Sequence, residues 1–225
     1  MTEELTFGER TCRLFGSERP ACLLVQPSAR HETATLAAEA AQIAARSTAP
    51  FVLAAFEVGD WIVDLMPWPD RDISREEEAG RHGQEALQYV LSSLLPALRE
   101  RFGDLPAVMG GYSLGGLFSL WTAAQTDSFV AVAAASPSVW IRDWQAFSEQ
   151  HPTLARAVYL SLGDREEHVR NQAIARVGDC IRAQYALLQR QLGPERSTLV
   201  WEPGNHFTDN EGRLARAFAW CLEIM

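Results

Sequence analysis

The seven residues from Gly110 to Gly116 constrain the fold of this chain more than any other segment. They read Gly-Gly-Tyr-Ser-Leu-Gly-Gly and contain the pattern G-x-S-x-G around Ser113. An apolar run precedes them, and an apolar run with helical spacing follows them. This context predicts a strand over Ala107–Tyr112, a sharp turn at Ser113 and a helix over Leu114–Gln125.

The glycines around Ser113 have a mechanical explanation. A serine in such a turn has a strained backbone, and a side chain two residues before or after it would collide with neighbouring backbone. The following helix points the free N–H groups of its first turn, and the positive end of its dipole, at the serine. Ser113 is therefore a candidate nucleophile, and the N–H of Leu114 is a candidate donor to an oxyanion.

Outside this segment, short apolar runs alternate with longer helical patterns. That alternation is typical of a mainly parallel α/β sheet flanked by helices on both faces. No repeat or low-complexity linker interrupts the 225 residues, so we expect a single domain over residues 1–225. Leu5–Phe7 and Thr11–Phe15 are expected to form antiparallel edge strands. Further strands are expected at Ala21–Gln26, Phe51–Phe56, Phe129–Ala135, Ala157–Leu162 and Thr198–Trp201.

The helical segments carry start and stop signals. Ser74 begins a capping-box pattern, which predicts a long helix to Phe102 that is kinked at Pro96 and ended by Gly103. The preceding segment Val58–Asp72 is rich in Trp, Pro and Asp and is expected to be a loop. Other helices are expected at Thr33–Arg46, Asp143–Gln150, His168–Leu192 and Asn210–Ile224.

A serine hydroxyl is a poor nucleophile at neutral pH and needs a general base. In chains with an elbow of this kind, the acid and then the histidine follow the serine, so His31 and His82 are out of order. His151 and His168 lie at the ends of polar helical segments and are expected to be solvated. His206 follows the last predicted strand, where loops meet at the carboxyl edge of the sheet, and is the candidate base.

The acid that orients His206 is expected at the end of a strand between Ser113 and His206. The strand Ala157–Leu162 leads into Gly163-Asp164-Arg165-Glu166-Glu167, which offers three carboxylates. In many such enzymes the acid stands three residues after a glycine, which favours Glu166. Asp164 is the alternative, and Glu167 is the third choice.

Four segments carry a resemblance to a known family. They are Gly110–Gly116, the run Ala-Ala-Ser-Pro-Ser-Val-Trp that ends at Trp140, Leu160–Glu167, and the run Pro-Gly-Asn-His-Phe around His206. From Ala21 onward the chain resembles the putative-esterase family of α/β-hydrolases, with its esterase D-like, enterobactin-esterase-like and feruloyl-esterase-like enzymes. The resemblance implies the α/β-hydrolase fold and catalytic roles for Ser113, Glu166 and His206, with Trp140 in the substrate pocket.

The chain departs from many members of that family after its strand Ala21–Gln26. Many relatives have a His-Gly or Gly-Gly turn there, whereas this sequence continues Gln26-Pro27-Ser28. Pro27 has no N–H to donate. We therefore expect the second oxyanion donor at the N–H of Gln26, with the N–H of Ser28 as the alternative.

Several aromatic residues lie in or beside predicted rim loops. Trp68, Tyr112 and Trp140 are candidate substrate-binding residues, because exposed aromatic rings in loops often form binding surfaces. Trp61 lies in the same loop region as Trp68. The alternative is that these tryptophans fill a core beneath the long loops.

The composition excludes several classes of function. A formal charge of −9 repels nucleic-acid phosphates and anionic lipid, so neither a nucleic acid nor a membrane is expected as a partner. No leader or bilayer-spanning run is visible, and the four cysteines lack metal or paired spacing, so we expect buried free thiols in a cytoplasmic protein. Asp60, Asp64 and Asp70 lack the spacing of a calcium loop, so no metal or other cofactor is expected.

The sequence thus predicts a serine hydrolase that cleaves a small-molecule carboxylic ester through an acyl-enzyme on Ser113. Acyl transfer to an alcohol or sugar at the same site is one alternative. A non-catalytic binding protein of the same fold is another, and the intact serine, acid and histidine set argues against it.

Overall fold

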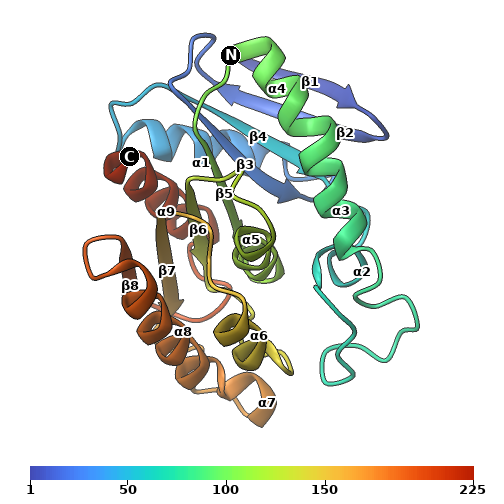
Figure 1. Cartoon of the computed structure of the whole chain (residues 1–225), viewed down its shortest axis with the longest axis vertical. Coiled ribbons are helices and arrows are strands. Elements are labelled where there is room, and N and C mark those ends of the chain that lie inside the picture. The colour runs from blue at the N-terminus through green and yellow to red at the C-terminus, as the bar shows by residue number, and fades with distance from the viewer.

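The computed structural model describes residues 1–225 and contains one sheet of eight strands, in the order β1-β2-β4-β3-β5-β6-β7-β8 (Figure 1). β2 runs antiparallel to both β1 and β4, and every other neighbouring pair is parallel. The prediction of a mainly parallel sheet with an antiparallel edge is therefore confirmed. The strands are β1 Thr2–Phe7, β2 Arg10–Gly16, β3 Cys22–Ser28, β4 Phe51–Glu57, β5 Ala107–Tyr112, β6 Ala131–Ala135, β7 Ala157–Gly163 and β8 Ser197–Glu202.

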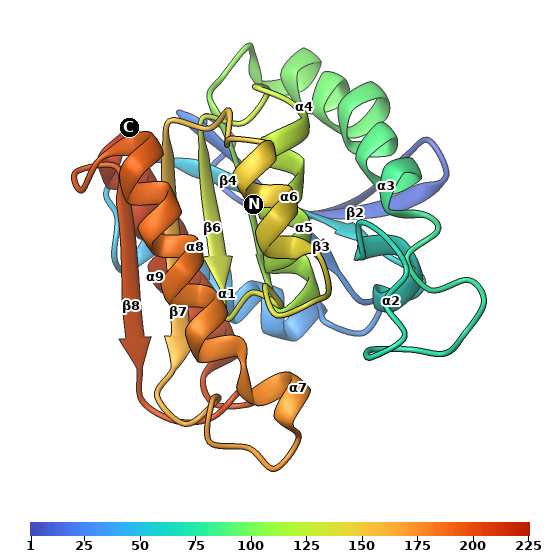
Figure 2. The same cartoon turned by 60° about the horizontal axis from the view of Figure 1, so that its bottom comes forward.

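Alternate residues of the strands face two separate hydrophobic cores. Leu23 and Val25 belong to one core and Leu24 to the other, as the two-residue period of a strand requires. Helices α1 and α9 cover one face of the sheet, and α3 to α6 with α8 cover the other, as Figures 1 and 2 show. The helices are α1 Thr33–Ala44, α2 Trp61–Leu65, α3 Gly83–Tyr89, α4 Leu95–Phe102, α5 Leu114–Gln125, α6 Trp144–Gln150, α7 Gln172–Ala175, α8 Val177–Leu192 and α9 Asn210–Ile224.

Small residues in the middle of the sheet allow α9 to pack closely. β6 reads Ala-Val-Ala-Ala-Ala, and all of it is buried. A Cβ atom added to Gly110 would lie only 2.3 Å from the ring of Phe218 on α9. Burying a side chain of this size contributes about 2 kcal/mol to the docking of the helix. The position of α9 over the sheet is therefore closely defined, and so are the side chains at its first turn.

The predicted start of a helix at Ser74 is wrong. Its hydroxyl accepts a hydrogen bond from the N–H of Glu76 at 3.1 Å and closes a short turn instead. Residues 75–78 are all charged and offer no apolar side to the core, so burial does not stabilise a helix there. The helix begins at Gly83, passes through a π-helical turn at Val90–Leu94, and has Pro96 in the first turn of α4.

The helix predicted from His168 also begins later. The side chain of Asn171 accepts from the N–H of Ala173 at 3.0 Å and caps the short helix α7, which α8 then follows. Residues 164–171 consequently form a loop at the carboxyl end of β7. This loop, rather than a helix, carries Glu166.

β3 extends past its predicted end at Gln26 and includes Pro27. Its pairing with β5 stops at Val25 opposite Met109, whereas its pairing with β4 continues to Ser28. Pro27 lies where β5 has already turned away, so its missing N–H costs no ladder hydrogen bond on that side.

All four cysteines are free, as expected, but they are not all buried: Cys12, Cys22 and Cys221 are buried, while Cys180 on α8 is half-buried. None of the helices combines the length and apolar character needed to cross a lipid bilayer.

Candidate active site

Ser113 occupies the turn between β5 and α5, with φ 56° and ψ −115°. A positive φ is strained for a residue other than glycine, so the surrounding structure must hold the turn. The end of β6 does so: the Ser113 N–H donates to the Ala135 carbonyl at 3.0 Å, and the Ser138 N–H donates to the Ser113 carbonyl at 3.1 Å. A Cβ on Gly111 would lie 2.4 Å from the backbone of Gly115, so only glycine fits there.

His206 lies in the loop between β8 and α9 and faces Ser113. Its Nε2 atom is 3.1 Å from Ser113 Oγ, and its Nδ1 atom is 2.7 Å from Glu166 Oε2. The hydroxyl of Tyr112 donates to the carbonyl oxygen of His206 at 2.8 Å and holds the loop. A buried carboxylate, an imidazole and a hydroxyl thus form one hydrogen-bonded chain, an arrangement that can move a proton from the hydroxyl to the imidazole.

Glu166 is only 4% exposed, and its carboxylate is fully hydrogen-bonded. While Oε2 faces His206, Oε1 accepts from the N–H of Gly163 at 2.8 Å, the hydroxyl of Ser136 at 2.7 Å and Arg213 at 2.8 Å. Burial by itself raises the pKa of Glu166, but hydrogen bonds from His206 and Ser136 outweigh burial and hold the pKa below its usual value. Glu166 therefore faces the imidazole as an ionised carboxylate.

The other two carboxylates of the β7 loop have different partners. Asp164 accepts from the N–H of Gly204 at 2.9 Å, and Glu167 forms an ion pair with Arg182 at 2.8 Å. Neither has a hydrogen bond to His206. Among the three candidates, the structure brings Glu166 alone into contact with the histidine.

Arg213 is a site residue that sequence reasoning missed. Its side chain is completely buried, and its second guanidinium nitrogen donates to the carbonyl oxygens of Pro203 and Asn205 at 3.1 Å each. Because the first nitrogen binds Glu166, Arg213 links the acid to the loop that carries His206. The available signal was its position four residues before Ala217, on the apolar face of the predicted last helix, where a charge needs a partner.

Two serines in the run before Trp140 were also missed as site residues. Ser136 has a positive φ of 44°, and its hydroxyl donates to Glu166. The hydroxyl oxygen of Ser138 lies 3.4 Å from that of Ser113. The Ser-Pro-Ser spacing thus puts one hydroxyl on the acid and the other beside the candidate nucleophile.

The start of α5 presents free N–H groups beside Ser113. The first hydrogen bond of the helix runs from Leu117 to the Ser113 carbonyl, which leaves the N–H of Leu114 without an intrahelical partner. The backbone N–H of Gln26, the predicted second donor, faces away from Ser113. The Leu23 N–H donates to the carbonyl of Pro106, just before β5. Along β3 the backbone N–H groups of successive residues point alternately to β5 and to β4. The N–H of Gln26, three residues after Leu23, therefore points to β4.

The same argument applies to the alternative donor, Ser28. Its carbonyl accepts from the N–H of Val58, which follows β4, so its backbone also faces β4. Between Gln26 and Ser28, the residue whose backbone faces Ser113 is Pro27, which has no N–H to donate. The structure therefore brings Leu114, and neither Gln26 nor Ser28, to Ser113 through a backbone N–H.

Two cavities flank Ser113 and His206. The α1–α9 cavity has a volume of about 330 Å³ and lies between those two helices and the ends of β3 and β5. The α7–α8 cavity has a volume of about 290 Å³ and lies beyond the ends of β6 and β7. Its apolar side chains are Trp140, Val169, Ile174, Val177 and Phe207.

The aromatic residues predicted to bind substrate lie in different parts of the structure. Trp140 lines the α7–α8 cavity, and Tyr112 lines the α1–α9 cavity together with Trp61. Trp68 lines neither: it packs against Trp144, and its indole N–H donates to the carbonyl of Arg142 at 2.9 Å. The structure therefore places Trp68 in the packing beneath the loops, the alternative considered for it.

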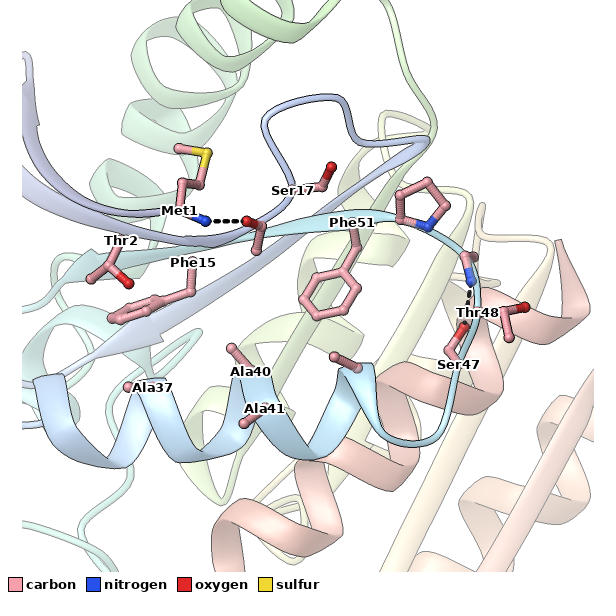
Figure 3. Close-up of a pocket in the computed structure, with 14 residues that line it drawn as sticks. Met1, Thr2, Phe15, Ser17, Ala37, Ala40, Ala41, Ser47, Thr48 and Phe51 are labelled. Atoms are coloured by element: carbon pink, nitrogen blue, oxygen red, sulfur yellow. Dashed lines mark hydrogen bonds between the residues drawn. The ribbon is translucent and has the colours of Figure 1, made fainter.

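A third cavity, of about 480 Å³, lies at the opposite ends of the strands. Figure 3 shows Phe15 and Phe51 above Ala37, Ala40 and Ala41 of α1. No histidine, cysteine or carboxylate side chain lines this cavity.

The aspartates weighed as a metal loop have protein partners. Asp60 caps α2, accepting from Ile62 N–H at 2.8 Å, and Asp64 accepts from Gly59 N–H at 2.9 Å. Asp70 accepts from the N–H of Arg142 at 2.7 Å. No group of three or more His, Cys, Asp or Glu side chains is arranged to hold a metal ion.

Residues 30–198 match the model of the family described as "Putative esterase". The chain belongs to this esterase family. The siderophore hydrolase EstA from Aspergillus nidulans is similar in structure, with a TM-score of 0.77 and 18% identity over 100% of this chain and 94% of that chain. An IroE-like serine hydrolase from Shewanella oneidensis has a TM-score of 0.75 and 11% identity over 99% and 80%. No curated protein matches the chain.

These comparisons confirm the predicted family and the α/β-hydrolase fold. At such low identity the solved structures show the fold alone, while the family match makes this protein an esterase. The roles of individual residues in this esterase follow from the geometry of the site and are proposed below.

Proposed function

We propose that this esterase hydrolyses small-molecule carboxylic esters through an acyl-enzyme on Ser113. The observation that carries the proposal is the hydrogen-bonded chain from Ser113 through His206 to Glu166, which lies between two cavities. A hydroxyl in contact with a histidine that a buried carboxylate orients is the arrangement that generates a serine nucleophile.

In the first half of the reaction, Ser113 Oγ attacks the ester carbonyl carbon while His206 Nε2 takes the hydroxyl proton. The carbonyl oxygen becomes an oxyanion, and the N–H of Leu114 and the positive end of the α5 dipole stabilise it. When the carbon–oxygen bond of the ester breaks, His206 returns the proton to the leaving alkoxide. An alcohol departs, and the acyl group remains on Ser113.

In the second half, water takes the place of the alcohol. His206 accepts a proton from water, the hydroxide attacks the acyl carbon, and Ser113 leaves with the proton from His206. The product is a carboxylic acid, and the enzyme is regenerated. Through both halves the Glu166 carboxylate holds Nδ1 as the donor and stabilises the imidazolium.

The two cavities suggest how an ester is positioned. The bond that is cleaved lies at Ser113, which both cavities share, so the acyl and alcohol parts extend in opposite directions. The α7–α8 cavity has an apolar rim, where Val169, Ile174 and Phe207 are 38%, 36% and 86% exposed. We expect this side to take an apolar part of the ester, because covering such a rim removes apolar surface from water.

A labelling experiment tests the nucleophile. A fluorophosphonate probe should label the wild-type protein and the His168→Ala control, whose histidine is exposed, but not Ser113→Ala. With an activated ester, Ser113→Ala and His206→Ala should each lose on the order of 10⁴-fold in kcat. Strong labelling that survives Ser113→Ala would contradict the proposal.

Product analysis distinguishes hydrolysis from acyl transfer at the same serine. With an acceptor alcohol added to the assay, hydrolysis yields the free acid as the main product. A new ester that forms in preference to the acid would show that an alcohol, rather than water, is the acceptor.

A further inference from the structure

The α1–α9 cavity contains more hydrogen-bond acceptors than the protein satisfies. Gln26 and Glu39 line it and are each 3% exposed. The Gln26 side-chain amide donates to Glu39 Oε2 at 3.2 Å. The Oε1 atoms of Gln26 and Glu39, and Oδ1 of Asn210 on the same cavity, are buried without a partner. A buried acceptor without a partner destabilises the protein, so three in one cavity point to a donor from outside the chain.

The carboxylate groups that line the α1–α9 cavity are not balanced by arginine or lysine. Glu32, Glu39 and Glu211 all line it, no arginine does, and the chain contains no lysine. Glu32 accepts from the N–H of Ala29 at 2.7 Å, which is a neutral donor and leaves its charge uncompensated. The lining therefore favours a positively charged occupant.

Glu39 has the environment of a carboxylate that lacks a cation. Burial raises the pKa of Glu39 to about 8; the hydrogen bond from Gln26 lowers it, while the charges of Glu211 and Glu32 raise it further. A cation that entered the cavity would favour the ionised carboxylate and oppose these effects.

We propose that the α1–α9 cavity binds a primary ammonium group carried by the ester substrate. An ammonium has three N–H donors and no acceptor, which matches three acceptor oxygens without partners in an acidic lining. A water molecule would bring two donors and no charge. Because Ser113, Leu114 and His206 line the same cavity, the ammonium and the ester group can belong to one molecule.

This inference rests on the proposed function of Ser113. It implies a substrate with a charged part and an apolar part on either side of the ester group. The ammonium-bearing part lies between α1 and α9, and an apolar part lies in the α7–α8 cavity. A like-charged carboxylate group on the substrate would be repelled from the first of these positions.

The test compares esters that differ only at the far end of the acyl chain. The p-nitrophenyl esters of 6-aminohexanoate and 8-aminooctanoate carry a terminal ammonium, and those of heptanoate and nonanoate carry a methyl group of similar size. We expect the wild-type enzyme to prefer at least one ammonium ester over its methyl partner by about tenfold or more in kcat/KM. One good charge-assisted contact is enough for that ratio.

The ratio should depend on Glu39. In Glu39→Gln, which keeps the shape and the Gln26 contact but cannot ionise beside a cation, the preference should fall toward one, although Glu32 and Glu211 remain. In Glu39→Leu the methyl esters should be the better substrates. Because the ratio is compared, a change in rate common to both esters cancels. Glu85→Gln, which changes an exposed glutamate on α3, is the matched control and should keep the wild-type ratio.

The outcomes separate this inference from the proposed function. Ratios near one for both chain lengths in the wild type, or ratios that Glu39→Gln and Glu39→Leu leave unchanged, would overturn the ammonium site. If Ser113→Ala abolishes hydrolysis in the same assays, the acyl-enzyme proposal still stands. If Ser113→Ala hydrolyses both esters at the wild-type rate, the proposed function itself fails.

Discussion

Arg213 and Glu166 form a buried ion pair with 2.8 Å between nitrogen and oxygen, and their side chains are 0% and 4% exposed. A pair this deep in the protein is costly to break, because removing one partner leaves the other charge buried and uncompensated. The pair lies directly behind the contact between Glu166 and His206, so the stability of the fold and the geometry of the site depend on the same interaction.

Arg213→Met should therefore reduce the free energy of unfolding by about 3–5 kcal/mol. Urea denaturation measures this loss. Arg182→Met is the control, since it removes an ion pair in which Arg182 is 47% exposed, and it should cost less than about 1 kcal/mol. Equal losses for the two variants would show that Arg213 does not support the buried carboxylate.

The identity of the acid can be tested by two matched substitutions. Glu166→Gln should reduce kcat by about 10⁴-fold, because the amide can donate to Nδ1 and hold the histidine in the wrong tautomer. Asp164→Asn removes a carboxylate that only accepts from the Gly204 N–H, and it should change kcat by less than about tenfold. A collapse of kcat in Asp164→Asn alone would transfer the role of the acid to Asp164.

The elbow should not tolerate a side chain at Gly111. Gly111→Ala puts a methyl group 2.4 Å from the Gly115 backbone, so α5 must move away from β5, and Ser113 moves with it. We expect a loss of kcat of at least about 10²-fold, since a shift near 1 Å has that effect in many enzymes. Gly59→Ala is the control, because its methyl group would lie at an ordinary 3.7 Å from Asp64. Wild-type kinetics in Gly111→Ala would contradict the close approach.

Glu39 should make the protein less stable as the pH rises. Burial holds the pKa of Glu39 at about 8 in the folded chain, against an ordinary value of 4.5, so between these values the folded state binds more protons than the unfolded state. The free energy of unfolding then falls with rising pH in this window, by up to about 1.4 kcal/mol per pH unit.

Glu39→Gln removes this slope but keeps Glu32 and Glu211, whose titration is common to both proteins. Urea denaturation at pH 5 and at pH 8 should show the variant gaining stability over the wild type as the pH rises. A stability difference that is the same at both pH values would contradict the raised pKa.

The parts of the site that could be predicted from the sequence depend on local spacing. The elbow at Ser113 needs only a strand, a glycine-flanked turn and a helix in succession, and all three are adjacent in the chain. The position of His206 after the last strand follows from the order of elements in a parallel sheet. These inferences do not require knowledge of how distant helices pack.

What could not be predicted depends on contacts between distant segments. The spacing from Gly163 favoured Glu166 over Asp164, but the contacts of these residues with His206 and with the Gly204 N–H depend on how the loops meet. The loop that replaces the predicted helix at Ser74 likewise reflects missing burial rather than a missing cap. The direction of the Gln26 N–H depends on which strands flank β3, and the sequence does not encode that locally.

The packing of α9 has a consequence for the order in which the site can form. The helix carries Arg213, which binds Glu166 and the loop of His206. A chain in which the elbow has folded but α9 has not yet docked still lacks this support. We therefore expect the hydrogen-bonded chain to settle only after α9 docks on the alanines of β6, so the docking of this helix, rather than the folding of the elbow, completes the site.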